Sequence, residues 1–580
     1  MSGSSRPEDG QPGAADPVDG PGAEALDGDP LIDPIAHLLP AGERRGTVVV
    51  TDAQRRERAE QWRVRLAPSD RTGVRVLEAE PDTTEEDLRT ALVAGGSDDV
   101  MVVVLAPSSV VRIFGSHRQL VRQIFAHVRP HGAFLVDVSD DRAEHGREAR
   151  LERMLRAVRE AMDDTTPLDE EAGTLDVARA ARELHDLGDV VVILKRGKHA
   201  YAVGEGVPLS LITAREPDTT ATVLATRPGG VLDVRMRESS YGPSRAEPWP
   251  DALPYPHVDL RRYDGGLLSL GGMRLFSGTT VLPESFRWSH HRPLTHPHLH
   301  SVSPGFLRVP RRTHAVALEG EHYYVDCVFD GHFGHLTTEV VCRFWGWDEA
   351  KRQIPDLKAL VHVRPKPDAG RLERMLLTAY GVAPDDIVIA EQPVRLRTVV
   401  GASPMWHNQD PHHAHPDIVD TWHRLTAGLL GDASPGTHER IFVSRGPGLA
   451  NRRPCRNQAE LERFFADRGF HVFYPEDLPM QEQVALFAGA RVVAGFGGSA
   501  MFNLMHCQHL GSTVVISHNG YVARNEHLFT SLLGADIHYF WQEPEVEPPE
   551  HGRTRQSDRS GFSFDFAGQG ADLERVLAEA

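Results

Sequence analysis

The chain has 580 residues, of which 40% are hydrophobic and 25% charged, and its formal net charge is −19. This length allows two or more domains, each with a hydrophobic core. The negative charge argues against broad binding to nucleic acid or anionic lipid, although local basic clusters can still bind phosphate. The four cysteines form no CxxC pair, which argues against a disulfide scaffold or structural zinc and favours a reducing cytoplasm.

The first 45 residues are rich in Gly, Pro, Ala and Asp, and they lack a basic start followed by an apolar block. We therefore expect residues 1–45 to form a disordered acidic tail rather than a secretory signal. No run along the chain approaches the roughly 18 apolar residues that a membrane span needs. A cytoplasmic protein is expected, and association with the inner face of the membrane stays open.

Residues 46–205 alternate strand and helix patterns, beginning with the apolar strand TVVVTD at 47–52. This alternation predicts a Rossmann-like, doubly wound α/β domain. The stretch from DDVMVVVLAP to GAFLVDV resembles the later half of a class I methyltransferase fold. That fold carries a glycine-rich loop for the methyl donor after its first strand, and TVVVTDAQRRE has none. We therefore predict a degenerate domain without that cofactor, with an active S-adenosylmethionine-dependent methyltransferase as an alternative.

The rest of the chain falls into further α/β regions. In order, the sequence predicts helices around 145–162 and 169–187, a strand pair at 190–203, a β-rich stretch up to 310, α/β regions from 313 and over 437–542, and a polar tail with one helix at 546–580.

The stretch GFGGSAMFN follows the apolar run Arg491–Ala494. It places Gly497 and Gly498 before an expected amphipathic helix, Ser499–Cys507. Unpaired N–H groups and the positive end of the dipole at a helix N-terminus attract anions, and glycine lets an anion approach closely. We interpret this turn as a cradle for a diphosphate, with Ser499 adding a hydroxyl. Tight strand–helix packing would explain the glycines equally well.

A second segment favours an anion site. The strand Ile441–Val443 ends in Ser444 and Arg445, and the loop GPGLANRRPCRN that follows carries Arg452, Arg453 and Arg456. Ligands in open α/β sheets bind at the carboxyl ends of strands, and arginine matches phosphate oxygens in bidentate geometry. A solvated basic loop is the alternative.

A third segment, YPEDLPMQEQVALFAGA, places Glu482 and Gln483 at the start of a helix. Glu482 is a candidate acceptor of hydrogen bonds from sugar hydroxyls, and equally a first-turn charge that the helix dipole favours.

These three segments together resemble glycosyltransferase family 61, which includes capsular polysaccharide biosynthesis proteins. The order Ser444-Arg445, Arg453…Asn457-Gln458, GFHVFYPE, Glu482-Gln483 and GGSAMFN agrees with the family over roughly 110 residues. The segment GHFGHLTTEVVCRFW fits an upstream part of the family more loosely. One departure is that the family's histidine before Gly-Ala is Gly497 here, so backbone groups and Ser499 would have to replace it, and activity could be lost.

The resemblance implies a glycosyltransferase B architecture of two Rossmann-like lobes. We expect an N-terminal acceptor lobe at 210–395 and a C-terminal donor lobe at 396–545, both downstream of the domain at 46–205. The resemblance also implies an inverting, metal-independent enzyme of bacterial cell-surface polysaccharide synthesis, with no cofactor beyond its nucleotide-sugar donor. The expected donor-binding residues are Ser444, Arg445, Arg452, Arg453, Glu482, Gln483, Gly497, Gly498, Ser499 and Asn503.

Inversion needs a base on the acceptor side, within hydrogen-bond reach of the attacking hydroxyl. His335 and Glu339 are spaced i, i+4 and so share a helix face. Because histidine titrates near neutral pH, His335 is the predicted base, with Glu339 as its partner. A packed histidine on a capped helix is an equally good explanation.

Two histidine-rich segments, 289–300 and 407–417, show neither HExxH nor a helical histidine pair with a carboxylate. We expect surface or acceptor-binding loops there and no metal site.

The predicted partners are therefore a nucleotide sugar and a saccharide or lipid-linked saccharide acceptor, without nucleic acid. A non-catalytic nucleotide-sugar-binding scaffold is a further alternative, and the sequence leaves the donor sugar, linkage and oligomeric state undetermined.

Overall fold

The structure is a computed structural model. It describes residue 38 and residues 46–66, 73–94, 100–129, 131–139, 155–156, 158–159, 162, 177–178, 180–196, 201–244, 246–290, 294–299, 314–446, 453–549 and 554–580. Apart from Leu38, the predicted acidic tail lies outside the described residues, and so does most of the predicted helix at 145–162.

The N-terminal region is a Rossmann-like sheet with the strand order β2-β1-β3-β4-β6-β5. Its first four strands are parallel and its last two pair antiparallel. The strands are β1 (Thr47–Asp52), β2 (Val74–Ala79), β3 (Val100–Val104), β4 (Ala133–Asp137), β5 (Ala181–Asp186) and β6 (Val190–Lys195).

Helices cover both faces of this sheet, as the alternating strand and helix patterns predict. The helices are α2 (Arg56–Leu66), α3 (Glu85–Ala94), α4 (Pro107–Phe114) and α5 (His117–Ile124). Val49 packs with Trp62 of α2 on one face, while Val48 and Val50 pack with Leu88 of α3 on the other. Successive residues of a strand point to opposite faces, so each face receives its own apolar layer.

Two sequence-based expectations about this region are only partly confirmed. The helix expected at 169–187 is wrong for its last part, which forms strand β5, and the mixed polar pattern ARELHD suits an exposed sheet edge. Val177, Ala178 and Ala180 just before it are helical, and the other residues of 169–180 lie outside the described part of the chain. Both strands expected at 190–203 are present, but they do not pair with each other, because they lie in different sheets. β6 completes the N-terminal sheet, whereas β7 (Tyr201–Ala202) pairs in parallel with β14 (Thr280–Val281) of the central sheet.

The central sheet has the order β18-β17-β16-β19-β12-β13-β14-β7, with β15 also paired to β19 and β8 to β12. Strands β16 to β19 run parallel to their neighbours within that group. The strands not yet given are β8 (Thr220–Arg227), β12 (Val258–Ser269), β13 (Leu275–Ser277), β15 (Val316–Ala317), β16 (Glu321–Tyr324), β17 (Lys358–His362), β18 (Ile387–Ala390) and β19 (Val394–Ala402).

The helical segments of the central region are α9 (Leu209–Arg215), α10 (Phe333–His335), the π-helix η4 (Leu336–Val340), η5 (Val341–Gly346), α11 (Trp347–Gln353), α12 (Arg371–Tyr380) and α13 (Ile418–Leu430). Two small antiparallel pairs flank them: β9 (Gly230–Asp233) with β11 (Ala252–Tyr255), and β20 (Trp406–His407) with β21 (His413–Ala414).

The C-terminal sheet is parallel throughout, in the order β10-β26-β25-β24-β22-β23. Its strands are β10 (Glu238–Tyr241), β22 (Arg440–Val443), β23 (His471–Phe473), β24 (Val492–Phe496), β25 (Ser512–His518) and β26 (Asp536–Gln542). Its helices are α14 (Gln458–Ala466), α15 (Met480–Gly489), α16 (Asn525–Leu533), α17 (Arg555–Asp558) and α18 (Phe566–Glu579).

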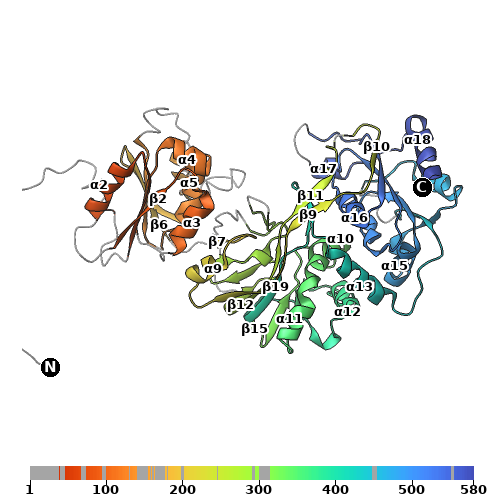
Figure 1. Cartoon of the computed structure of the whole chain (residues 1–580), viewed down its shortest axis with the longest axis horizontal. Coiled ribbons are helices and arrows are strands. Elements are labelled where there is room, and N and C mark those ends of the chain that lie inside the picture. Colours follow the sequence, from red (N-terminus) through yellow and green to blue (C-terminus); the bar gives the residue numbers. More distant parts are fainter. Residues whose placement is uncertain are drawn as a thin grey trace, which may run out of the picture.

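Helices α14 and α18 cover one face of this sheet, and α15 and α16 cover the other (Figure 1). The core on the α15 and α16 side is continuous with that of the central region. It includes Leu260 of β12 and Val400 of β19 together with Val493 of β24 and Val515 of β25. The central and C-terminal sheets therefore share one apolar core. Among the described helices, none combines the length and the apolar character needed to cross a membrane.

Candidate functional site

The glycine turn lies where the sequence places it, directly after the buried strand β24. Gly498 has a φ of +146°, in the region that favours glycine. A Cβ atom at Gly498 would lie 2.8 Å from a terminal guanidinium nitrogen of Arg453 and 3.5 Å from one of Arg445. Both the backbone conformation and the close approach of Arg453 therefore favour glycine at this position, and Arg445 lies in ordinary contact distance of it.

The segment after the turn differs from the expected amphipathic helix. Ser499–His506 is a 3-10 helix, η9, and its residues from Met501 onward are buried. The segment therefore packs on all sides instead of presenting a polar face. Its first N–H groups, at Ser499 and Ala500, are still of the kind that a helix leaves without internal partners.

Arg445 extends from the carboxyl end of β22 toward the glycine turn. Its Nη1 donates to the Arg453 carbonyl (2.7 Å), and its Nη2 donates to the Gly497 carbonyl (2.6 Å). Burial and the charge of Arg453 lower the pKa of Arg445 to about 9. The Arg453 guanidinium lies 3.7 Å from the ring centre of Tyr521. Two convergent guanidinium groups make this turn suitable for an anion.

The amide of Gly498 is not bare, which corrects the sequence-based interpretation of the turn. Its N–H donates to Oε1 of Glu526 (2.9 Å), from the first turn of α16. Glu526 is 1% exposed, and its Oε2 has no hydrogen-bond partner among the described residues. Burial raises the pKa of Glu526 to about 7. The side chain of Glu526 thus accepts a hydrogen bond from one of the N–H groups expected to hold a diphosphate. The N–H of Gly497 donates to the Ile516 carbonyl.

Sequence reasoning missed Glu526. The available signal was positional: Glu526 opens the helix that follows β25, the neighbour of β24, and the carboxyl ends of parallel neighbours share one edge of a sheet.

The remaining predicted donor residues have varied surroundings. Ser444 is buried and its hydroxyl donates to Glu462, while Arg452 lies outside the described residues. Glu482 is exposed in the first turn of α15. Gln483 donates to the carbonyls of Pro475 and Leu478, and the amide nitrogen of Asn503 lies 3.5 Å from its Oε1. Ser444, Gln483 and Asn503 therefore hold the protein framework around the turn.

Another loop residue, Arg456, is directed away from this turn. It forms a bidentate pair with Glu545, at 2.6 Å for each hydrogen bond, and both side chains are about half exposed. Among the described residues, the candidate anion-binding group is thus Arg445 and Arg453.

His335 and Glu339 pair as their spacing predicts. Nδ1 of His335 lies in hydrogen-bond contact with Oε1 of Glu339, which also forms an ion pair with Arg287 (2.6 Å). Glu339 is 6% exposed. If Nδ1 carries the proton that bonds Glu339, Nε2 of His335 keeps a lone pair and can accept a proton. The π-helix η4 provides this pairing, and π-helical turns are frequent at functional sites.

The histidine pair and the glycine turn are adjacent in space. A Cβ atom at Gly334 would lie only 2.7 Å from Cβ of Ser499 and 3.2 Å from the Phe502 ring. Helix α10, which ends at His335, therefore packs directly on the start of η9. Segments about 160 positions apart in the sequence, which carry the predicted base and the predicted donor residues, are therefore neighbours in the fold.

Hydrogen bonds also link the surroundings of Glu339 to Glu526. Next to Arg287, the indole N–H of Trp288 donates to Oδ1 of Asn408 (2.9 Å), and Asn408 Nδ2 donates to Oδ1 of Asn525 (2.9 Å). Asn525 is the neighbour of Glu526 in α16. These hydrogen bonds connect the segment that carries Arg287 to the start of α16.

The histidine-rich segments are more buried than expected. His407 and His413 are 2% and 6% exposed, and their rings stack with centres 4.7 Å apart. His290, from the other segment, contacts His413 edge to face at 5.2 Å. The expectation of surface loops is therefore wrong for His407 and His413. Within the described part of the chain, no group of three or more potential ligands could hold a metal ion.

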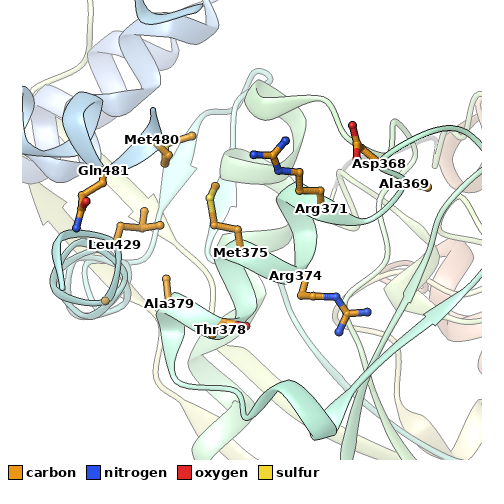
Figure 2. A pocket seen from close by; sticks show the side chains of 11 residues that line it. Asp368, Ala369, Arg371, Arg374, Met375, Thr378, Ala379, Leu429, Met480 and Gln481 are labelled. Carbon is orange, nitrogen blue, oxygen red and sulfur yellow. The ribbon is translucent and has the colours of Figure 1, made fainter. Parts of the chain in front are cut away.

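A separate hollow of about 720 Å³ lies between α12, α13 and the first turn of α15 (Figure 2). Arg371, Arg374 and Met375 of α12 line it, with Leu429 of α13 and Met480 of α15 across from them. The predicted donor and catalytic residues are not part of its lining. This hollow is thus distinct from the site at the glycine turn.

Residues 333–516 match the family model Glycosyltransferase 61. The match begins at α10 and extends into β25, so the matched segment includes His335, Arg445 and the glycine turn. Glu526 and Arg287 lie outside the matched residues.

Curated proteins and solved structures were compared with the chain as well. No curated protein matches the chain. Solved structures of the MycE methyltransferase from the mycinamycin biosynthetic pathway, with Mg and SAH bound, overlap 30% of this chain at 13% identity and a TM-score of 0.21. A complex that also contains mycinamycin VI overlaps 32% at 15% identity and the same TM-score. The chain spans about half the length of these structures.

Proposed function

We propose that this protein is an inverting glycosyltransferase. It would move a sugar from a nucleotide-diphosphate sugar to a hydroxyl group of a saccharide or lipid-linked saccharide. The observation that carries the proposal is the packing of α10 on η9, because it brings the segment with the histidine–carboxylate pair against the end of the glycine turn on which two arginines converge. The family match supports glycosyl transfer, and the donor class and stereochemistry are our inference.

In the proposed reaction, Nε2 of His335 accepts the proton of the acceptor hydroxyl while that oxygen attacks the anomeric carbon of the donor. The bond from this carbon to the diphosphate oxygen breaks, and the nucleoside diphosphate leaves with the electron pair. Attack from the face opposite the leaving group inverts the configuration. Glu339 keeps the imidazole oriented and stabilises its protonated form.

Arg445 and Arg453 would stabilise the charge that develops on the leaving diphosphate, together with Ser499 and the first N–H groups of η9. Fixed donors directed at developing charge usually supply the largest part of a catalytic effect. Glu526 would be neutral in this state, because burial raises its pKa to about 7 and a nearby diphosphate raises it further. Such a site needs neither a metal ion nor a cofactor beyond the donor.

We further propose that the central and C-terminal sheets are the acceptor and donor lobes of a glycosyltransferase B architecture. The parallel strands β16 to β18 and the all-parallel C-terminal sheet are consistent with two Rossmann-like lobes. Bacterial cell-surface polysaccharide synthesis on the cytoplasmic side of the membrane remains the proposed setting. The degenerate domain at 46–205 is proposed to have no reaction of its own.

The test is a turnover assay with UDP-, GDP- and CDP-sugars, with and without EDTA, which measures donor hydrolysis and transfer. At least one donor should be turned over equally in both conditions. His335→Ala should lower kcat by at least about 100-fold, the usual scale for a general base. His438→Ala, at a remote histidine stacked on His471, should change nothing. Equal rates in the two variants would remove His335 from the mechanism.

A non-catalytic nucleotide-sugar-binding protein is a second candidate. Two observations favour it: glycine replaces the family's histidine at position 497, and Glu526 occupies the Gly498 amide. In that case one nucleotide would bind to the full chain, while no sugar in the panel would be hydrolysed or transferred.

A further inference from the structure

A second cavity lies at the carboxyl edge of the central sheet. It has a volume of about 240 Å³ and is bounded by the segments that follow three parallel strands, β16, β17 and β18. Ligands in open α/β sheets bind at this edge. The cavity is smaller than the roughly 300–1,000 Å³ of a pocket for a complete ligand, so it suits a single ring.

A buried histidine with one unused nitrogen lines this cavity. His362, the last residue of β17, is 5% exposed, and its Nε2 has no hydrogen-bond partner among the described residues. On the other side of the ring, Nδ1 lies 3.5 Å from Ser269 Oγ and 3.7 Å from Asp326 Oδ2. Leaving a buried polar atom unpaired costs about 1–3 kcal/mol, so this nitrogen favours a ligand with a hydrogen-bonding group.

Asp326 is held firmly behind His362. Its Oδ2 accepts hydrogen bonds from the Tyr324 hydroxyl (3.0 Å) and the Met273 N–H (2.8 Å), and its Oδ1 accepts from the Cys327 N–H (2.8 Å). Burial lowers the pKa of His362, which keeps the imidazole neutral at neutral pH. A neutral imidazole presents either a donor or an acceptor at Nε2, which is what a hydroxyl group can match.

Two consecutive glycines shape the opposite wall. Gly271 and Gly272 have φ values of +73° and +60°, in the left-handed region. A Cβ atom at Gly271 would lie 3.1 Å from Cβ of His362, and one at Gly272 would lie 3.4 Å from Cδ2 of His298. The guanidinium of Arg274 stabilises this loop, because it donates hydrogen bonds to the Gly271 carbonyl (2.8 Å) and the Leu270 carbonyl (3.0 Å). The backbone thus approaches both histidines closely.

The charges around the cavity balance. Two guanidinium groups, Arg274 and Arg364, and two carboxylates, Asp330 and Glu391, line it. Arg364 is bonded to Asp330 at 2.7 Å. The remaining lining includes the apolar side chains of Val328, Val363 and Pro393. Apolar walls with a few convergent polar groups and no net charge suit an uncharged ring that carries hydroxyl groups.

The cavity also borders the predicted base. The segment Cys327–Asp330 forms one wall, through Val328 and Asp330, while the ring of Phe329 in the same segment contacts the ring of His335, with centres 4.5 Å apart. A ring bound in the cavity would therefore lie on the other side of this short segment from His335.

We propose that this cavity binds one uncharged sugar ring of the acceptor, with a ring hydroxyl hydrogen-bonded to Nε2 of His362. The name acceptor rests on the proposed function, whereas the sugar-binding cavity itself does not. Because acceptor recognition and donor binding use different residues, the two proposals can fail separately.

The experiment uses the full chain and a panel of methyl glycosides of glucose, galactose, mannose and N-acetylglucosamine. Binding is measured by saturation-transfer NMR and by the ring signals of labelled histidines. At least one glycoside should bind and shift the His362 signal. His362→Phe keeps a planar ring but removes both nitrogens, and it should lower the affinity for that glycoside at least fivefold. His322→Phe is the matched control, because His322 is a buried histidine on β16 that does not line the cavity.

Several results would overturn the inference: no glycoside bound to the wild-type chain, a glycoside bound equally well by His362→Phe, or a His362 signal that responds to inorganic phosphate or methyl glucuronide and to no neutral sugar. The wild-type histidine signals decide the matter even if a variant fails to fold. UDP and GDP are titrated in parallel. If the chain binds a glycoside at His362 but binds no nucleotide, the proposed donor is wrong and the sugar-binding cavity is supported. If the chain binds a nucleotide but no glycoside, only the sugar-binding cavity is wrong.

Discussion

At the scale of single residues, the candidate site brings several charged side chains close together. Arg445 and Arg453 converge on Gly498, and Glu526 reaches the same turn from α16. The guanidinium groups were predictable, because they follow a strand in the sequence. Glu526 was not, since its role depends on which helix packs beside the turn.

Glu526 should make stability depend on pH. Burial raises its pKa from 4.5 to about 7, so the folded chain holds this proton at pH values where the unfolded chain has released it. The stabilisation is therefore complete below about pH 4.5 and is lost as the pH rises through about 7. Urea unfolding measures the effect. Between pH 5 and pH 8, the free energy of unfolding of the wild-type chain should fall by on the order of 2–3 kcal/mol more than that of Glu526→Gln.

The control for this prediction is Glu545→Gln, which removes an exposed carboxylate paired with Arg456. This variant should follow the wild-type pH dependence. An identical pH dependence in Glu526→Gln and the wild type would show that Glu526 is not buried in the way described.

At the scale of elements, the sequence predicts best where apolar runs and turn residues agree. Strands β22 and β24 and the glycine turn between β24 and η9 lie where expected. The prediction failed where tertiary packing overrides local pattern. The polar edge strand β5 resembles a helix in sequence. The segment after the turn is a 3-10 helix that is buried because α13, α15 and α16 pack around it together with α10.

The glycine turn gives a direct test at this scale. Gly498→Ala should weaken UDP binding at least tenfold in calorimetry, because the new Cβ lies 2.8 Å from a guanidinium nitrogen of Arg453 and must displace it. Gly534→Ala is the matched control. Gly534 also has a positive φ, +69°, but no atom lies within 4 Å of its Cβ position. It should cost about 1–2 kcal/mol of stability and leave UDP binding unchanged.

If both alanine variants bind UDP like the wild type, close approach at Gly498 is not needed for the nucleotide. The turn would then be explained by strand–helix packing alone.

At the scale of the whole molecule, the described part of the chain is built around three large sheets. The central and C-terminal sheets share one core around the proposed site, whereas the N-terminal sheet has apolar clusters of its own. Tyr201 links the N-terminal and central regions, since its hydroxyl accepts a hydrogen bond from Arg89 of α3 and its ring lies 4.6 Å from the guanidinium of Arg215. The α/β class was predictable from the alternation of elements, but the exchange of β7 and β10 between regions was not, because such pairings are made between residues distant in sequence.

Ligand-dependent melting distinguishes the regions. A nucleotide present at 100 times its Kd should stabilise the chain by about 2.7 kcal/mol and raise Tm measurably. S-adenosylmethionine should not, because the first strand of the N-terminal sheet, TVVVTD, is followed by AQRRE and has no glycine-rich loop after it. A rise in Tm with S-adenosylmethionine and none with UDP, GDP or CDP would instead favour the methyltransferase alternative.

The central claim is that Arg445 and the glycine turn hold the diphosphate of a nucleotide. Its most direct test is calorimetric titration of UDP and GDP into Arg445→Ala and Arg456→Ala, which remove two arginines of neighbouring segments. Arg445→Ala should lower the affinity for the nucleotide about 10- to 100-fold, as expected for the loss of charged hydrogen bonds. Arg456→Ala should bind like the wild type, because Arg456 is paired with Glu545. Unchanged affinity in Arg445→Ala would contradict the claim.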